Sequence, residues 1–288
     1  MTTDLLTVAG LGRRGIAEII ALSERTDLGK PLAGKGVALV FQKPSARTRN
    51  SMEMAVVQLG GHPVYIQKEE VGLGSRETAE DVARTLACFH EIIAARVMDH
   101  KDLERMAAAT HKPVLNMLSD LAHPLQALAD LLTVKQLTGR IEGAKIAYVG
   151  DANNVAISLA EACSLMGAEL VIASPQGYAM DETPDGVRQV ADPAEAVEGA
   201  EIVYTDVWVS MGQDEETEAR ARAFADYCVD EALMARSPNA HFLHCLPARR
   251  GEEVTHAVME SPRSAVWKQA ENRMHTARGA LAWMLGVR

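Results

Sequence analysis

Short apolar runs that alternate with helix-like stretches are the feature of this sequence that most limits its fold. In the first half the apolar runs are Val37–Phe41, Val64–Ile66, Ile92–Val97 and Val114–Met117. Helical patterns lie around and between them, near Ile16–Leu22, Ser51–Leu59, Thr78–Phe89 and Leu103–Ala108. Strands that alternate with helices pair in parallel and connect through helical crossovers. The sequence therefore predicts an α/β fold of parallel sheets flanked by helices.

The second half repeats this alternation, which indicates a second α/β domain. Its predicted strands are Lys145–Val149, Leu170–Ala173, Ile202–Thr205 and Phe242–Cys245, and a last helical pattern covers about Lys268–Leu285. The turn-rich stretch Thr138–Gly143 precedes the first of these strands, so we place the domain boundary there. A chain of 288 residues is long enough for two domains, each with its own core.

The segment Lys43–Arg49 (KPSARTR) has the composition of a phosphate-binding turn. It joins a predicted strand to a predicted helix, and the first N–H groups of a helix lack internal partners and attract anions. Ser45 and Thr48 supply hydroxyl groups. Arg47 and Arg49 supply guanidinium groups that can bind phosphate oxygens in pairs. Taken alone, the segment fits an ordinary capped helix start with solvated arginines equally well.

Two further segments contain residues that could act on a substrate. His123 and Gln126 lie one turn apart at the start of the apolar helix Ala127–Val134, where they could donate to a carbonyl and accept from an amide. Taken alone, His123 is more typical of a helix-capping or hydrogen-bonded structural histidine. The segment His241–Pro247 (HFLHCLP) is typical of a buried strand, in which Cys245 alone would be a small core residue.

Taken in order along the chain, these segments resemble the motifs of the carbamoyltransferase family. The family's phosphate-binding STRTR corresponds to Ser45–Arg49, its HPxQ to His123–Gln126 and its HCLP to His244–Pro247. Two more motifs resemble those of the branch that acts on ornithine: GDxxN at Gly150–Asn154 and DxWxSMG at Asp206–Gly212. The similarity extends from Leu5–Val8 to the terminal helix.

The resemblance implies two domains with separate substrates. A carbamoyl phosphate-binding domain would cover residues 1–137, and the terminal helix, residues 268–288, would pack back on it. An ornithine-binding domain would cover residues 138–267. The resemblance also implies a homotrimer.

The resemblance assigns one set of residues to carbamoyl phosphate. They are Ser45, Ala46, Arg47, Thr48, Arg96, His123, Gln126, Cys245, Leu246 and Arg273. Arg96 would polarise the carbamoyl oxygen together with His123 and Thr48, while the phosphate-binding turn stabilises the charge of the leaving phosphate. Gln126 and the carbonyl of Leu246 would receive the carbamoyl NH₂ group. Arg273 would complete the contacts with the oxygen and the phosphate.

A second set is implied for the amine substrate, L-ornithine. It consists of Asn154, Asp206, Ser210 and Met211, with Asp206 and Cys245 near the reacting amine. The residues implied as catalytic are Arg47, Arg96, His123, Asp206, Cys245 and Arg273. An alkylammonium group has a pKa of about 10.4, so the site must favour the free base before attack. The leaving phosphate can accept the proton, and no metal or organic cofactor is implied.

Three positions depart from the family pattern. Ala46 replaces a threonine, which removes one hydroxyl but keeps the backbone N–H. Gln42 stands where glutamate is common. Gly72 stands where many members have a glutamine that reaches into the neighbouring subunit's site, so that contact is not expected here.

Composition narrows the possible partners and the setting. The net charge of −10 argues against nucleic acid or an anionic membrane as a partner. No apolar run reaches the ~18 residues of a membrane span, and Met1–Asp4 lacks a basic segment, so we expect a cytoplasmic protein. The four cysteines are scattered, and His241 and His244 point to opposite faces of a strand, so neither disulfides nor a metal site is predicted.

Two other functions remain open. The chain could be a sister carbamoyltransferase acting on an acylated ornithine, putrescine or aspartate. It could also be a non-catalytic ligand-binding module on the same scaffold. Such a module would be expected to have lost Arg47, Arg96 or His123, and all three are present.

Overall fold

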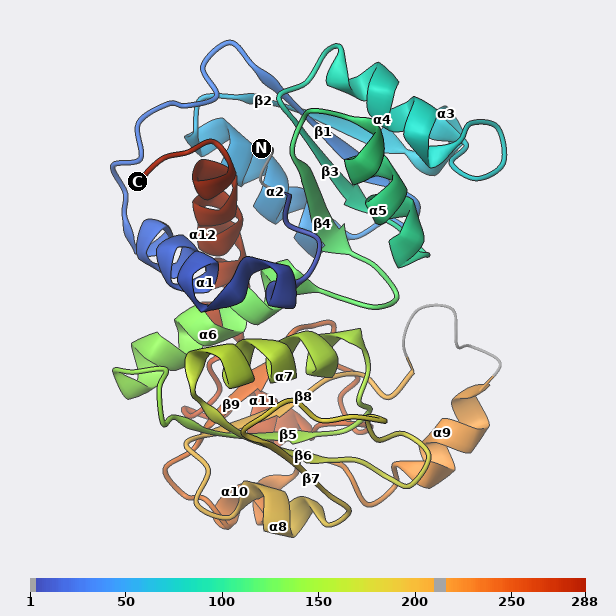
Figure 1. Ribbon diagram of the computed structural model, residues 1–288. Helices are drawn as coiled ribbons and strands as arrows, with labels where there is room; N and C mark the ends of the chain where they lie inside the picture. The colour runs from blue at the N-terminus through green and yellow to red at the C-terminus, as the bar shows by residue number, and fades with distance from the viewer. Residues whose placement is uncertain (1–3, 210–215) are drawn as a thin grey trace. The chain divides into compact units, whose positions relative to one another are not determined.

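A computed structural model of the protein describes residues 4–209 and 216–288 (Figure 1). These residues form two compact units. Unit 1 contains the described residues up to Ala129 together with Asn272–Arg288, and unit 2 contains those from Asp130 to Glu271. The chain passes from unit 1 to unit 2 within helix α6 (Pro124–Thr138) and returns within helix α12 (Val266–Met284).

Within the residues described, unit 1 builds a parallel sheet of four strands in the order β2-β1-β3-β4. The strands are β1 (Gly36–Phe41), β2 (His62–Gln67), β3 (Ile92–Arg96) and β4 (Val114–Leu118). The helices that lie wholly in this unit are α1 (Val8–Glu24), α2 (Ala46–Gln58), α3 (Lys68–Val71), α4 (Ala79–Ala87) and α5 (His100–Ala109). Every residue of β3 is buried, as expected for an apolar strand with a neighbour on each side.

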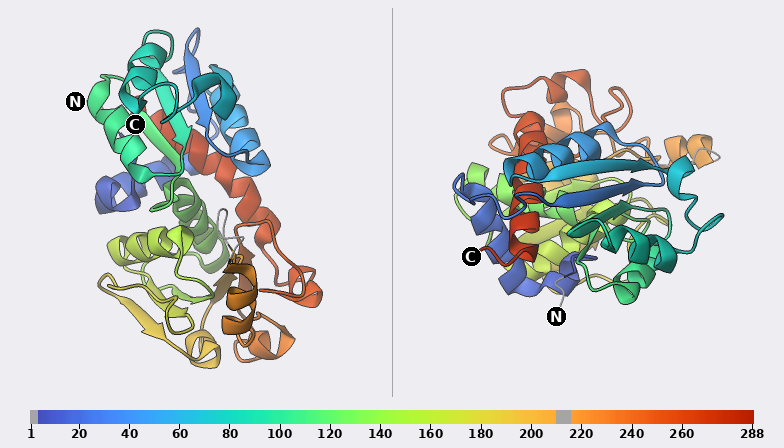
Figure 2. Two further views of the ribbon diagram at one scale, coloured as in Figure 1. Left: turned by 90° about the vertical axis from the view of Figure 1, so that its right-hand side faces the viewer. Right: turned by 90° about the horizontal axis from the view of Figure 1, so that it is seen from above.

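The terminal part of α12 packs closely against α1 within unit 1 (Figure 2). A Cβ on Gly279 would lie 2.3 Å from the Ser23 hydroxyl oxygen and 2.7 Å from the Ile19 carbonyl oxygen, so a larger side chain would force the helices apart. Arg278 donates to the Ser23 carbonyl at 3.0 Å and to the Gln58 side chain at 2.9 Å. The expectation that the terminal helix packs back on the first domain is confirmed.

Over Asp130–Val209 and Glu216–Glu271, unit 2 forms a parallel sheet of five strands in the order β7-β6-β5-β8-β9. The strands are β5 (Lys145–Val149), β6 (Glu169–Ala173), β7 (Val187–Val190), β8 (Ile202–Thr205) and β9 (His241–His244). The helices are α7 (Asn154–Met166), α8 (Pro193–Val197), α9 (Thr217–Ala223), α10 (Glu231–Ala235) and α11 (His256–Met259).

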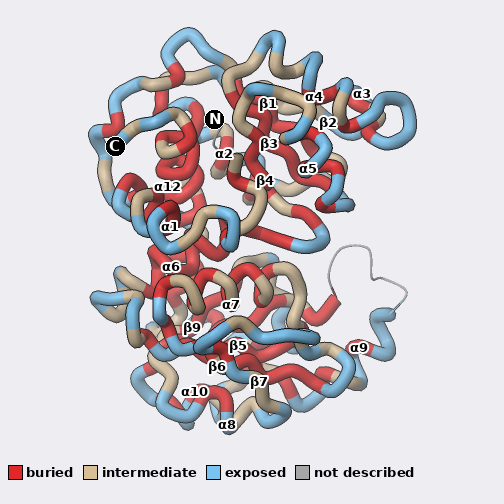
Figure 3. The backbone as a smooth tube through the Cα atoms, in the orientation of Figure 1, coloured by how far each residue is buried: buried red, intermediate tan, exposed pale blue. Residues whose placement is uncertain are grey.

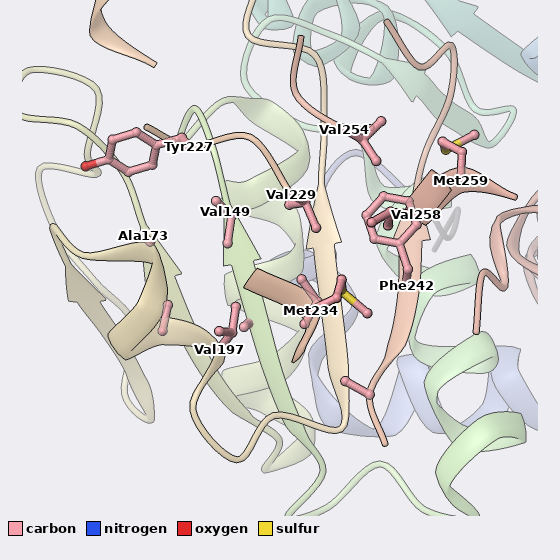
Figure 4. Close-up of a cluster of buried hydrophobic side chains, with 14 of the residues drawn as sticks. Val149, Ala173, Val197, Tyr227, Val229, Met234, Phe242, Val254, Val258 and Met259 are labelled. Atoms are coloured by element: carbon pink, nitrogen blue, oxygen red, sulfur yellow. The ribbon is translucent and has the colours of Figure 1, made fainter. Parts of the chain in front are cut away.

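Apolar residues are buried on both faces of the sheet of unit 2, and most residues of β5, β8 and β9 are buried (Figure 3). Alternate strand residues such as Val149 and Phe242 point into one apolar cluster, which Met234 and Val258 complete from the helices (Figure 4). The intervening residue Tyr148 is also fully buried, on the opposite face of its strand. A parallel sheet that is covered on both faces is what the apolar runs predict.

The order of the strands indicates where ligands bind. In an open parallel sheet, ligands bind beyond the carboxyl ends of the strands, where the strand order reverses. In unit 1 this point lies between β1 and β3, where Ser45 follows β1 and Arg96 is the last residue of β3. In unit 2 it lies between β5 and β8, and the segments that follow carry Asn153 and Asp206.

The predicted α/β fold with two parallel sheets is confirmed. Strand β7 was not predicted, and several predicted elements differ at their ends. Helix α2 begins at Ala46 rather than at the predicted Ser51, because Ser45 accepts a hydrogen bond from the N–H of Thr48 and caps the helix there. Cys245 follows β9 rather than ending it. In the part of the chain that the structure describes, no helix is long and apolar enough to cross a bilayer.

Candidate functional site

The phosphate-binding turn forms the first turn of α2. Ser45 is the N-cap, and its hydroxyl lies 3.2 Å from the Thr48 hydroxyl. Arg47 is half-buried, and it makes no hydrogen bond or ion pair with another described residue. Arg49 instead pairs with Glu53 at 2.8 Å and lies over an aromatic ring, so its guanidinium is engaged on the surface of the unit. Ala46 is exposed at the first helical position, where its backbone N–H has no partner four residues earlier in the helix.

Two arginines converge on the hydroxyl of Thr48. Arg96, at the end of β3, donates to it at 3.4 Å, and Arg273, on α12, donates to it at 3.3 Å. All three residues are buried, and their side chains come from widely separated parts of the sequence. Two positive charges held this close repel each other, and an anion placed beside them interacts favourably with both. The arrangement therefore suits a small anion with several oxygens.

Arg273 also fixes the state of His123, which lies directly before α6. A guanidinium nitrogen of Arg273 lies 3.2 Å from Nε2 of His123, and the same nitrogen donates to the side-chain oxygen of Gln126. Since arginine has no acceptor, Nε2 must accept, and the neutral ring carries its proton on Nδ1. Burial, and then the charges of Arg273 and Arg96, hold the pKa of His123 well below its usual value. At neutral pH the ring is therefore uncharged and can act as a hydrogen-bond donor through Nδ1.

Unit 2 contains a second polar group of residues, centred on Asp206. The carboxylate accepts from the Asn153 side chain at 3.0 Å and from the Cys245 thiol at 2.9 Å. The N–H of Val207 donates to the same carboxylate at 2.8 Å. Asp206 and Cys245 directly follow the neighbouring strands β8 and β9, and Asn153 lies in the turn after β5. These hydrogen bonds hold the buried carboxylate in one orientation. A carboxylate held in this way can bind an ammonium group.

The remaining residues predicted to bind the amino acid lie in two places. Asn154 is the first residue of α7, and the Asn153 side chain caps this helix by accepting from the N–H groups of Val155 and Ala156. Ser210 and Met211 lie outside the described residues.

One buried arginine that no sequence pattern singled out links two segments of this region. Arg220 of α9 donates to Asp151 at 2.7 Å and to the carbonyl of Trp208 at 2.9 Å, and its guanidinium lies over the ring of Tyr178. It thus ties the turn after β5 to the segment that follows Asp206. Burial raises the pKa of Asp151, and the charge of Arg220 opposes that rise.

Leu246 has a backbone conformation that needs outside support. Its φ of +63° lies in the left-handed region, which costs a leucine about 1 kcal/mol or more. Its N–H donates to Nδ1 of His244 at 2.8 Å, and Nε2 of His244 lies 3.0 Å from the buried Glu253. These contacts fix the direction of the Leu246 carbonyl that was predicted to bind the carbamoyl NH₂.

The same contacts argue against a metal ion beside Asp206. Ligand atoms of Asp206, His244 and Cys245 lie within 4.8 Å of one another. Both nitrogens of the His244 ring are already engaged, by the Leu246 N–H and by Glu253, so the ring has no lone pair to offer a metal. The donor set therefore does not fit a metal site without rearrangement.

Gly72 is placed where a larger residue would be strained. It ends α3 in the left-handed conformation with φ of +60°, and a Cβ there would lie 2.7 Å from the Cβ of Arg76. The local backbone conformation therefore favours glycine, and a glutamine at this position would require the loop to adopt a different conformation.

Comparison with known proteins covers nearly the whole chain. Residues 3–136 match the family model described as aspartate/ornithine carbamoyltransferase, carbamoyl-P binding domain. Residues 142–284 match the model described as aspartate/ornithine carbamoyltransferase, Asp/Orn binding domain.

Three relatives illustrate the similarity. The ornithine carbamoyltransferase of Thermus thermophilus is 47% identical over 293 residues, which covers 98% of this chain and 96% of the relative. The solved structure of the Pyrococcus furiosus ornithine carbamoyltransferase is 41% identical, with a TM-score of 0.93 over 99% of this chain and 97% of its own. A solved N-acetyl-L-ornithine transcarbamylase is 29% identical, with a TM-score of 0.87 over 98% of this chain and 99% of its own. Similarity of fold alone therefore does not separate the two amine substrates.

Proposed function

Because this chain belongs to the aspartate/ornithine carbamoyltransferase family, we propose that it transfers the carbamoyl group of carbamoyl phosphate to the side-chain amine of L-ornithine, giving L-citrulline and phosphate. The observation that carries this proposal is the buried cluster of Thr48, Arg96, Arg273 and the neutral His123. It offers positive charge and directed hydrogen bonds, which are what a carbamoyl phosphate needs when its C–O bond breaks.

Unit 1 binds carbamoyl phosphate in this proposal. Ser45, Arg47, Thr48 and the N–H groups at the start of α2 hold the phosphate, and Ala46 contributes its backbone alone. Arg96, Arg273 and Nδ1 of His123 interact with the carbamoyl oxygen, whose negative charge grows as the amine attacks. Fixed donors aimed at a growing charge typically contribute roughly 100- to 1,000-fold each to the rate. The Gln126 side chain, whose oxygen accepts from Arg273, receives the carbamoyl NH₂.

Unit 2 binds ornithine in this proposal. The Asp206 carboxylate attracts an ammonium group of the substrate, and Asn154 with Ser210 and Met211 binds its α-carboxylate end. Cys245, whose thiol donates to Asp206, lies beside the reacting amine, and the Leu246 carbonyl binds the carbamoyl NH₂.

The proton balance needs no further group. The ornithine amine loses one proton before attack and a second as the C–N bond forms. The departing phosphate can accept one proton and solvent the other, so neither a dedicated general base nor a cofactor is required. Attack by the free amine forms a tetrahedral intermediate, which collapses when the phosphate oxygen leaves.

Measuring the carbamoylated product formed from each of several amines, which is citrulline when the amine is ornithine, tests the proposal. Purified protein is incubated with carbamoyl phosphate and, in parallel, with ornithine, N-acetylornithine, putrescine or aspartate. A site built for both ends of free ornithine should prefer it by at least about tenfold in kcat/KM, because each analogue leaves a polar group unpaired. Comparable turnover of an analogue would move the assignment to a sister activity, and binding of carbamoyl phosphate without any turnover would indicate a non-catalytic module.

We also propose that the protein acts in the cytoplasm as a homotrimer. The similarity to the family over both units supports this assembly. Light scattering of the purified protein should give the mass of three 31.1 kDa chains. A fully active monomer would refute the trimer.

A further inference from the structure

A buried polar network joins the segment that follows Arg96 to the turn that precedes His123. Strand β3 ends at Arg96, and the chain then begins α5 at His100. Strand β4 ends at Leu118, and a short turn leads from there to His123. Since β3 and β4 are neighbouring parallel strands, the segments that follow them leave the same edge of the sheet.

Ser119 closes the turn before His123. Its N–H donates to the carbonyl of Ala122 at 2.9 Å, and its hydroxyl accepts from the N–H of Ala122 at 3.1 Å. The side chain of Asn116, on β4, donates to the same hydroxyl and to the Ala122 carbonyl, both at 3.3 Å. Ser119 and Asn116 are completely buried. The turn that presents His123 is therefore fixed to the end of its strand.

His100 connects this turn to the loop after β3. Its N–H donates to the Asp120 side chain at 2.8 Å, and Nδ1 of its ring lies 2.7 Å from the Ser119 hydroxyl. The Ser119 hydroxyl already accepts two N–H groups, so it has one proton left to donate. Nδ1 of His100 at 2.7 Å is a nearer acceptor for that proton than the Ala122 carbonyl at 3.4 Å, so we assign the bond to Nδ1. His100 is only 6% exposed, so water does not readily replace this bond.

We propose that His100 is a positioning residue for the carbamoyl transfer. Through Ser119 it holds the turn before His123 at a fixed position relative to the loop that follows Arg96. This inference rests on the proposed function, because Arg96 and His123 are the residues assigned to the carbamoyl oxygen. A reacting group misplaced by about 1 Å can cost roughly 100-fold in rate, so the alignment of the two loops matters.

The atom that makes the contact suggests the informative substitutions. Nδ1 of histidine is bonded to Cγ, and so is the side-chain oxygen of asparagine. His100→Asn therefore keeps an acceptor in nearly the same place, while His100→Leu keeps the volume and removes the acceptor. We expect His100→Leu to lower kcat by about tenfold with the ornithine KM unchanged, and His100→Asn to recover most of the loss. Equal losses in the two variants would overturn the positioning role.

A double-mutant cycle tests whether Ser119 carries the effect. If His100 acts through Ser119, the variant with both His100→Leu and Ser119→Ala should lose about as much kcat as the worse single variant. Independent roles would instead multiply the two losses, and that result would refute the inference. His111→Leu is a matched control, because His111 is an exposed histidine of the same unit, and it should leave kcat unchanged.

Amide hydrogen exchange separates failure of this inference from failure of the proposed function. His100→Leu should speed exchange in the peptide that contains Ala122 and Gln126, whereas His111→Leu should not. An inactive wild-type protein would refute the proposed function, but the exchange rates of the two variants could still be compared. Unchanged exchange in His100→Leu would contradict the inference whatever the activity.

Discussion

The two substrate regions of this protein are constructed differently. In unit 1 two guanidinium groups from β3 and α12 are held at 3.4 and 3.3 Å from the hydroxyl of Thr48. In unit 2 a single carboxylate, Asp206, accepts from Asn153 and Cys245 at 3.0 and 2.9 Å. The first region concentrates positive charge in a chain whose net charge is −10, and the second concentrates negative charge. Each region thus has the charge opposite to that of the group it is proposed to bind.

The comparison shows two ways of assembling a site. The residues around Asp206 follow three neighbouring strands, so the sheet alone brings them together. The residues around Thr48 also need α12, which returns to unit 1 more than 140 residues after α6 begins and supplies Arg273. Substitutions should therefore separate the two regions, with carbamoyl phosphate affected by one and ornithine by the other.

The largest effect is expected at Arg273, which contacts Thr48, His123 and Gln126. Arg273→Met should lower kcat/KM for carbamoyl phosphate by at least roughly 100- to 1,000-fold, because it removes donors aimed at the carbamoyl oxygen and the phosphate. Steady-state assays measure this, with Arg14→Met as control because Arg14 is exposed on α1. Activity within about threefold of the wild type would show that the cluster is not the reaction site.

Asp206→Asn should affect the other substrate. It removes the negative charge that holds the ornithine ammonium and weakens the bond from the Cys245 thiol, so we expect a higher ornithine KM and a lower kcat, by about tenfold or more in kcat/KM. Steady-state kinetics with ornithine as the varied substrate measure both constants. An unchanged ornithine KM would place the ammonium group elsewhere.

At Arg47 we expect an effect on the affinity for carbamoyl phosphate. This half-buried guanidinium has no partner among the described residues that its loss would leave unpaired, so Arg47→Ala should keep the fold intact. Charged hydrogen bonds contribute roughly 1.5–3 kcal/mol each, so the affinity for carbamoyl phosphate should fall by about 10- to 100-fold. Calorimetry with the wild type as reference tests this, and unchanged affinity would remove Arg47 from the phosphate site.

The smallest effect concerns the loop at Gly72, outside both regions. Gly72→Gln forces a side chain into a left-handed conformation against Arg76, and should destabilise the protein by about 1–2 kcal/mol. Chemical denaturation measures this change, with Gly74→Ala as a comparison at a left-handed glycine that has open space around it. Equal destabilisation of both variants would mean that backbone conformation alone, and not Arg76, sets the cost.

Much of this architecture follows from local patterns in the sequence. The β3 and β5 strands are short apolar runs that a parallel sheet buries on both faces. Asp206 and Cys245 follow two further strands, but only the family resemblance assigned them a role in the site. Strand β7 was missed because only its first residue, Val187, is buried, so it lacks an apolar run. The start of α2 was placed too late because Ser45 was assigned to a phosphate-binding turn, whereas it also caps the helix.

Long-range contacts could not be predicted from the residues alone. Nothing near Arg273 indicates that it reaches His123, and its role was suggested only by family resemblance. Arg220 lies in an exposed stretch of mixed charge, where its burial against Asp151 has no local signal. The contact between His100 and Ser119 depends on two loops that only the pairing of β3 with β4 brings together.

The most direct test of the division between the two regions is a calorimetric titration of carbamoyl phosphate, in the absence of amine, into the wild type, Arg273→Met and Asp206→Asn. We expect one site per chain in the wild type, loss of measurable binding in Arg273→Met and wild-type affinity in Asp206→Asn. Equal weakening in both variants, or binding that survives Arg273→Met, would contradict the assignment of carbamoyl phosphate to the cluster around Thr48.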